Sequence, residues 1–376
     1  MSSYTIDEIF RQPASWRNIL ALAEENAENL SDFMADFLDE GGELLLAGAG
    51  TSDYIGKTLH PYLSRHSKYT VKTCGTTDLV TSPEDYLSAE KNTLLVSFAR
   101  SGDSPESLGA ISAAEAVSSR LRQLIITCNS QGKLSVLGAK NKAYYVINLP
   151  DETNDKGFAM TNSFTSMYLL ALLCLTPEKL AKNRAAVLDI AEAGERFLSN
   201  GAKTLADWAG GLGFNRVVYL GTDALKGLAQ ESGLKMLELT RGRIATLFDS
   251  PVGFRHGPKS FVNDETLVVL YLSDNPFARK YELDLLLELN RERQNYKLLV
   301  VSGQKCEEAA RLADYYCCFN NEGSYENALL APEFVLVAQL LALNKSLLLQ
   351  IDPDNPNPAG IVNRVVRGVT IYPYSK

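Results

Sequence analysis

Two sets of five short apolar runs, each interleaved with helical patterns, constrain the fold of this 376-residue chain most strongly. Such alternation is typical of a parallel sheet with helices on both faces, so we predict an α/β fold with two sheets. The first set of predicted strands is Leu44–Leu46, Val71–Thr73, Thr93–Phe98, Leu124–Thr127 and Tyr144–Ile147. The second set is Val217–Leu220, Ile244–Phe248, Leu267–Leu272, Lys297–Val301 and Tyr315–Phe319.

The two sets keep a constant spacing. Gly48 and Gly221 each end the first strand of a set and lie 173 positions apart, and Leu95 and Val268 have the same separation. Five strands in the same order at one offset indicate duplication of a single α/β unit. We therefore expect two similar domains in tandem.

The predicted domain limits follow from these sets. We expect a helical segment over 1–40, a first domain over 41–200, a second over 201–350 and a docking tail over 351–376. The run 352–360 holds too many Pro and Asn residues for regular structure, and the Val-rich stretch after it is expected to dock. Predicted helices outside the two sets are Ser15–Asp39, Ser163–Cys174 and Arg184–Leu198, the last two placed to pack one domain on the other.

Composition excludes several kinds of partner. A net charge of −8 argues against nucleic acid, but one donor-rich loop can still hold a small phosphorylated ligand. The six cysteines form no C-x-x-C pair, as expected in a reducing compartment. No signal peptide is evident at Met1, and the apolar runs Met167–Leu175 and Phe334–Leu343 are too short to span a bilayer. We expect a cytoplasmic protein without a membrane or nucleic-acid partner.

Three polar loops follow predicted strands of the first set. They are Gly48–Ser52, Ala99–Ser104 and Gly157–Ser163, and each opens a helix. Ser101 and Ser104 flank a glycine before Pro105, an arrangement that can cradle a phosphate with hydroxyl and backbone N–H groups. Ser104 can equally be a helix N-cap with Pro105 at the first helical position, and the two readings are compatible.

The second set lacks such a phosphate loop, because Leu272–Pro276 contains an aspartate that would repel an anion. It does contain Glu231, Lys235 and Glu238, spaced to share one helix face, and His256 before a Gly-Pro turn. A plain ion-pair stripe and a loop histidine would leave the same pattern, but carboxylate and imidazole are also the usual groups for proton transfer. We expect phosphate capture in the first half, proton transfer in the second, and an active site where the halves meet.

These motifs together resemble the sugar isomerase (SIS) family, and in particular the isomerase half of glucosamine-6-phosphate synthase. Three stretches, 97–107, 157–161 and 249–260, are more similar to the galactosamine-6-phosphate deaminase/isomerase family, formerly labelled tagatose-6-phosphate ketose/aldose isomerase. The resemblance covers nearly the whole chain and implies two tandem SIS domains, each flavodoxin-like with a five-stranded parallel sheet.

The resemblance also implies roles for single residues. Glu238 would move the proton between C2 and C1, and Lys235 would set the charge around it. His256 would open the sugar ring, either in its own site or in that of the neighbouring subunit. Two positions depart from the synthase pattern: Ala99 replaces a serine, and Arg367 replaces the C-terminal lysine. The residues implied to hold the phosphate or nearby hydroxyls are Thr51, Ser52, Arg100, Ser101, Ser104, Thr161 and Arg367.

The implied activity is deamination with isomerisation of a 6-phospho-2-amino-2-deoxyhexose, most specifically galactosamine 6-phosphate, giving tagatose 6-phosphate and ammonium. No cofactor is expected, and no His, Cys or carboxylate cluster has metal-ligand spacing. Plain aldose–ketose isomerisation and a sugar-phosphate-binding regulator stay open as alternatives. The Gly253–Lys259 turn, stiffened by two prolines, favours a homodimer.

Overall fold

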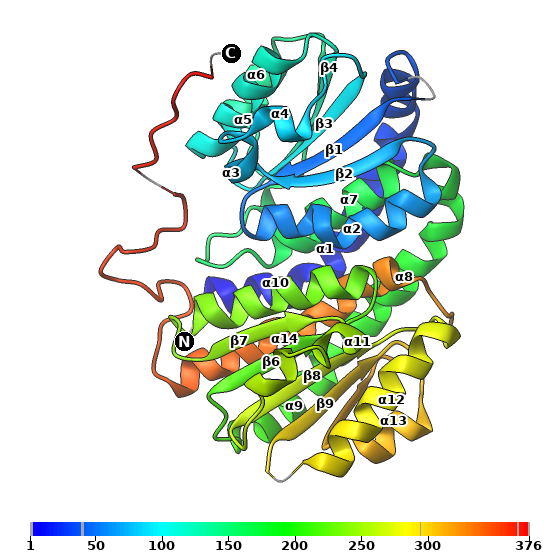
Figure 1. Ribbon diagram of the computed structural model, residues 1–376, viewed down its shortest axis with the longest axis vertical. Helices are drawn as coiled ribbons and strands as arrows, with labels where there is room; N and C mark the ends of the chain where they lie inside the picture. The colour runs from blue at the N-terminus through cyan, green and yellow to red at the C-terminus, as the bar shows by residue number, and fades with distance from the viewer. Residues whose placement is uncertain (1–2, 39–40, 294, 367, 375–376) are drawn as a thin grey trace. The chain divides into compact units, whose positions relative to one another are not determined.

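The computed structural model describes residues 3–38, 41–293, 295–366 and 368–374, and it confirms the two predicted parallel sheets (Figure 1). The strand orders are β2-β1-β3-β4-β5 and β10-β9-β8-β6-β7, so both sheets have the same topology. The first sheet contains β1 (Glu43–Gly48), β2 (Thr70–Gly75), β3 (Thr93–Ala99), β4 (Leu121–Thr127) and β5 (Tyr144–Asn148). The second contains β6 (Arg216–Leu220), β7 (Ala245–Asp249), β8 (Thr266–Leu272), β9 (Lys297–Ser302) and β10 (Tyr315–Cys318).

Helices alternate with the strands as the sequence predicts. Those of the first half are α1 (Tyr4–Ala35), α2 (Thr51–His66), α3 (Thr76–Leu79), α4 (Pro83–Tyr86), α5 (Pro105–Val117), α6 (Lys133–Gly138), α7 (Asn162–Cys174) and α8 (Leu180–Arg196). Those that follow are α9 (Ala202–Gly210), α10 (Ala224–Leu239), α11 (Pro251–Phe254), α12 (Pro276–Glu292), α13 (Glu307–Leu312) and α14 (Asn327–Leu348). Short 3₁₀ or π segments are Asp151–Thr153, Pro177–Lys179, Phe197–Gly201 and Pro258–Phe261.

The chain divides into two compact units. The first-sheet unit comprises Ser15–Lys156, Met160–Asn183 and Ala359–Lys376. The second-sheet unit comprises Met1–Ala14, Gly157–Ala159 and Arg184–Pro358. The sequence predicts continuous domains, whereas each unit consists of three separate stretches of the chain. The predicted domain limits therefore stay predictions.

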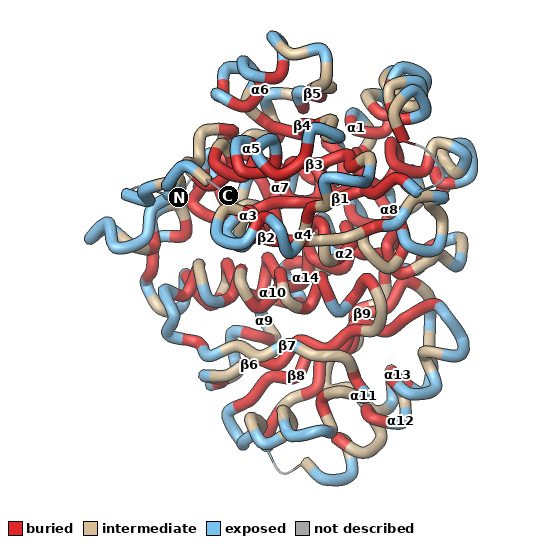
Figure 2. Tube along the Cα trace, turned by 45° about the horizontal axis from the view of Figure 1, so that its top comes forward, coloured by how far each residue is buried: buried red, intermediate tan, exposed pale blue. Residues whose placement is uncertain are grey.

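The central strand of each sheet is buried along its whole length. Every residue of β3 and of β8 is buried, and both strands pair on each side with neighbours (Figure 2). Burial on both faces explains their uninterrupted apolar sequence. The edge strand β7 is more exposed, and Phe248 faces solvent there.

The long N-terminal helix begins earlier than predicted, at Tyr4 instead of Ser15, and it includes Pro13. Asp354 explains this start, because its carboxylate accepts hydrogen bonds from the backbone N–H of Tyr4 (2.9 Å) and of Thr5 (2.8 Å). A side chain some 350 positions away therefore satisfies the free N–H groups of this helix end.

Helix α14 bears on the membrane prediction. It contains the run Phe334–Leu343, which was predicted to be too short to span a bilayer. The whole helix has 22 residues and is long and apolar enough to do so, so its length does not exclude a membrane span. Its most apolar window is 94% buried, which is the pattern of a core helix. Within its unit it packs against α10 and α9.

Candidate functional site

The loop after β3 is the first part of the candidate site. Ser104 caps α5 by accepting a hydrogen bond from the backbone N–H of Ser107, and Pro105 occupies the first helical position. Gly102 has a φ of 66°, in the left-handed region where glycine is favoured. The Asn129 side chain donates to the carbonyl of Ser101 at 2.9 Å and holds the turn from the neighbouring strand β4. The N-terminus of α5 thus presents hydroxyls and a positive dipole end.

A cavity of about 110 Å³ opens at this loop. Of the predicted residues, Ser52, Arg100, Ser101 and Ser104 line it. These side chains bring hydroxyl and guanidinium groups, the donors that bind a phosphate, to one small cavity. Residues missed by sequence reasoning that also line it are Ala49, Phe98, Ala99, Glu106, Ser107, Met160, Arg364, Val365 and Val366.

The C-terminal tail reaches this cavity in an extended form. Arg100 donates to the carbonyl of Arg364 at 2.8 Å, and the Arg364 guanidinium donates to the backbone carbonyl of Asp155. Farther along, Ile371 lies against Gly109 of α5. Arg367, predicted to bind substrate, lies outside the described residues.

Two predicted residues do not line the cavity. Thr51 is buried at the start of α2. Thr161 is fully buried and donates its backbone N–H to Asp155 at 2.8 Å. Asp155 also accepts from the backbone N–H and hydroxyl of Ser163, so this carboxylate caps α7. Asp155 is a supporting residue that sequence reasoning missed. Its partners lie six to eight positions away, at a helix start rich in Thr, Asn and Ser, and that pattern was the available signal.

Helix α10, in the second-sheet unit, brings the predicted proton-transfer residues together. Lys235 is fully buried, with its Nζ 2.5 Å from a Glu238 oxygen and 3.4 Å from a Glu231 oxygen. Burial opposes the charged ammonium, but the two carboxylates outweigh it, so the pKa of Lys235 lies above its ordinary value. The Glu238 side chain is 24% exposed, so its carboxylate is within reach of a ligand.

His256 lies in the turn between α11 and the Pro258–Phe261 segment, and it is exposed. Gly257 follows with a φ of 114°, a conformation that a side chain would strain. The turn is fixed to α12 by Arg255, which pairs with Glu288 at 2.8 Å, and by Lys259. The imidazole is therefore presented on a rigid turn.

A larger cavity, of about 710 Å³, lies elsewhere on the first-sheet unit. It forms where α1, α2 and α7 end, and its basic residues include Lys68 and Lys179. Cations at helix C-termini offset the partial negative charge of free carbonyls, which accounts for them without a ligand. Donor chemistry, not volume, therefore assigns the candidate site to the smaller cavity. Among the described residues, no group of three or more His, Cys, Asp or Glu side chains is placed to hold a metal ion.

Comparison with known proteins gives full-length similarity. The chain is 39% identical over 377 residues to D-galactosamine-6-phosphate deaminase AgaS of Escherichia coli, covering 99% of this chain and 96% of that protein. It is also 39% identical to the enzyme of the same name from Shewanella sp. (strain ANA-3), covering 99% and 92%. No family model matches.

Solved structures agree. Tagatose-6-phosphate ketose/aldose isomerase from Escherichia coli superposes with a TM-score of 0.91 at 35% identity, covering 100% of this chain and 98% of that one. The C-terminal domain of glucosamine-fructose-6-phosphate aminotransferase from Francisella tularensis has a TM-score of 0.77 at 17% identity, covering 94% and 98%, and therefore shares the fold.

Proposed function

Because the chain belongs to the D-galactosamine-6-phosphate deaminase family, we propose that it converts D-galactosamine 6-phosphate and water to D-tagatose 6-phosphate and ammonium. One observation within the chain carries the proposal: Glu238 is a partly exposed carboxylate held by a fully buried lysine. The ion pair fixes the direction of this carboxylate, as a general base requires.

The proposed chemistry begins with ring opening, assisted by His256, to give the free C1 aldehyde. Glu238 then removes the C2 proton, forming an enolamine across C1 and C2. The C1 oxygen takes up a proton as the enolamine forms. The proton on Glu238 then returns to C1, where the electrons of the double bond form the new C–H bond, and the nitrogen lone pair forms an imine at C2. Water adds to this imine and releases ammonia, which leaves the C2 ketone of the 6-phosphoketose. Lys235 pairs with the Glu238 carboxylate before that group accepts the C2 proton, and no cofactor takes part.

Phosphate capture is proposed for the cavity at the start of α5. Ser52, Ser101 and Ser104 supply hydroxyls, and Arg100 supplies charge. Thr161 and Asp155 are proposed to act indirectly, by fixing the start of α7. Thr51 and Arg367 stay as predicted ligands of the phosphate or of nearby hydroxyls.

Assembly and location are further parts of the proposal. We propose a homodimer in the cytoplasm, with a sugar phosphate as the only small-molecule partner. The exposed His256 on a rigid turn supports a role in the site of a neighbouring subunit.

A direct assay tests the proposed function. The purified protein is incubated with galactosamine 6-phosphate or glucosamine 6-phosphate, and ammonium and ketose phosphate are measured. We expect equimolar ammonium and tagatose 6-phosphate from the galacto substrate. Isomerisation of tagatose 6-phosphate without ammonium release from either amino sugar would instead favour the plain isomerase, the name carried by the Escherichia coli structure.

A further inference from the structure

Glu106 is a buried carboxylate that the proposed mechanism does not use. It follows Pro105 in the first turn of α5 and is only 6% exposed. Its Oε2 atom is buried and has no hydrogen-bond partner among the described residues. A buried unsatisfied polar group needs an explanation, and a role in binding a ligand supplies one.

Glu106 lines the same cavity as Ser101, Ser104 and Ser107. Because Glu106 and these serines line one small cavity of about 110 Å³, a phosphate held by the serines lies beside the carboxylate. The other titratable residues of its described lining are Arg100 from the β3 loop and Arg364 from the tail. Both guanidinium groups already donate to backbone carbonyls.

A carboxylate and a phosphate dianion at such close range repel each other. Two anionic groups in one site repel each other, so one of them normally keeps a proton, and the two groups share it. A phosphate ester has its second pKa near 6, so it can supply the shared proton at little cost. The proton also gives the orphaned carboxylate the hydrogen bond that it lacks.

On this basis, and resting on the proposed function, we propose that Glu106 makes phosphate capture proton-linked. The sugar phosphate is bound with one proton held between a phosphate oxygen and the Glu106 carboxylate. Above the phosphate pKa, binding therefore takes up close to one proton for each site. No covalent bond forms or breaks apart from the O–H bond that carries this proton.

The proposal sets Glu106 apart from the serines of the same loop. Removing a serine donor weakens capture at every pH. Removing the Glu106 charge, by contrast, strengthens capture at high pH, because the repulsion and the need for a proton disappear together. A merely structural role for Glu106 predicts neither effect.

The test uses an alditol 6-phosphate, which has no C1 carbonyl and cannot be turned over. Calorimetric titrations in two buffers of different ionisation enthalpy give the number of protons taken up at pH 8. For the wild type we expect close to one proton, with Kd rising about tenfold per pH unit between pH 7 and 9. Glu106→Gln should take up almost none and bind at least as tightly at pH 8. Glu115→Gln, an exposed change on the same helix, should behave like the wild type.

Every other result overturns the proposal, and the results are distinguishable. Binding to the wild type without proton uptake, or uptake that persists in Glu106→Gln, removes the proton link but leaves the phosphate site standing. A loss of affinity in Glu106→Gln that is confined to the 2-amino alditol phosphate would assign Glu106 to the ammonium instead. Absence of any binding of the alditol phosphate and of inorganic phosphate would also reject the phosphate site of the proposed function.

Discussion

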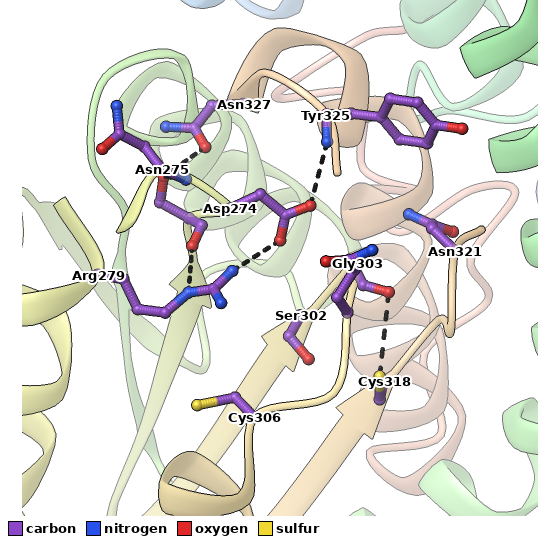
Figure 3. A network of polar contacts seen from close by, with 12 residues as sticks. Asp274, Asn275, Arg279, Ser302, Gly303, Cys306, Cys318, Asn321, Tyr325 and Asn327 are labelled. Atoms are coloured by element: carbon purple, nitrogen blue, oxygen red, sulfur yellow. Dashed lines mark hydrogen bonds and ion pairs between the residues drawn. The ribbon is translucent and has the colours of Figure 1, made fainter. Parts of the chain in front are cut away.

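The loops after the central strands of the two sheets differ in length and in the groups that fill them: five residues separate β3 from α5, and three separate β8 from α12. Ser101 after β3 and Asp274 after β8 lie 173 positions apart, the offset that also relates the two strands. Ser101 borders a cavity, whereas Asp274 accepts hydrogen bonds from Arg279 at 2.8 Å and from the backbone N–H of Tyr325 at 3.2 Å (Figure 3). The second turn contains its own anion, so only the first has room for one from a substrate.

The turns after the first strand of each sheet, β1 and β6, have kept their backbone conformation more closely. A Cβ on Gly48 would lie 2.3 Å from the Ser52 carbonyl carbon, and one on Gly221 would lie 2.4 Å from the Leu225 oxygen, so both strands must end in glycine. Two residues later, Gly50 (φ 56°, ψ −124°) and Asp223 (φ 61°, ψ −128°) share a conformation that favours glycine. The duplicated unit therefore keeps a strained start for its first helix even where the residue is no longer glycine.

The largest effect is expected from removing the proposed base, which lies in the second-sheet unit. Glu238→Gln should lower kcat about 10²- to 10⁴-fold, the usual contribution of a positioned general base. The Michaelis constant should change little, because phosphate capture is assigned to the other unit. Steady-state kinetics with galactosamine 6-phosphate measure both, with the exposed Glu308→Gln as control. Near wild-type turnover would place the base elsewhere.

A second test concerns the charge balance on α10. Lys235→Met leaves Glu231 buried without its counter-charge, which should cost about 3–5 kcal/mol of unfolding free energy. Lys226→Met, which breaks a half-exposed pair with Asp249, should cost less than about 1 kcal/mol. Urea unfolding measures both losses. Adding Glu231→Gln to Lys235→Met should recover part of the loss, and failure to do so would mean that packing rather than charge holds Lys235.

Much of the fold could be predicted because its signals are local. The all-buried strands β3 and β8 are continuous apolar runs, and the Ser104-Pro105 pair marks the start of α5. The start of α1 could not be predicted, because its cap, Asp354, comes from the other end of the sequence.

In the candidate site too, residues with a local sequence signal could be predicted and those that depend on distant parts of the chain could not. The spacing of Ser101 and Ser104 around a glycine predicts a phosphate loop. Glu106 does not, since an acid in the first turn of a helix is usually a solvated partner of the dipole. It shares its cavity with Val365 and Val366 of the tail, some 260 positions away, and no local pattern encodes that proximity.

Placing the residue of the second turn into the first tests whether the aspartate accounts for the difference between them. Ser101→Asp gives the first turn the residue of the second and should raise the Michaelis constant at least 100-fold, because an added carboxylate repels the phosphate. Ser101→Ala and Ser104→Ala should each raise it about tenfold by removing one charge-assisted hydrogen bond. Ser112→Ala, exposed on the same helix, should have no effect. An unchanged constant in all three loop variants would reduce the loop to a capped helix start.

The internal anion of the second turn predicts a pH dependence of stability. Desolvation by burial raises the pKa of Glu282, which accepts from the Ser273 backbone N–H, to about 7, and burial also raises the pKa of Asp274. A raised folded-state pKa means that folding binds protons, so stability present below about pH 4.5 is lost as the pH rises through 7. The loss is about 1.4 kcal/mol for each unit of pKa shift.

Fluorescence can isolate this effect. In a Trp16→Phe background, Trp208 is the remaining tryptophan and reports on the second-sheet unit. Urea unfolding at pH 5 and at pH 8 should show a smaller difference in Glu282→Gln than in the background protein. Glu308→Gln should leave the difference unchanged. Equal differences in all three proteins would mean that Glu282 does not bind a proton on folding.

The smallest expected effect tests whether the exposed His256 serves a neighbouring subunit. His256→Asn should slow turnover of cyclic substrate more than that of an acyclic analogue, because its proposed task is ring opening. If His256 acts across a dimer, mixing His256→Asn with Glu238→Gln subunits creates mixed dimers with one doubly altered site and one intact site. Half of the dimers are mixed after random exchange, so activity should return to about a quarter of the wild-type value. Subunit exchange is verified separately with differently tagged chains. If exchange is complete and no activity returns, His256 serves the same chain as Glu238, and the rigid turn after α11 is a feature of a self-contained site.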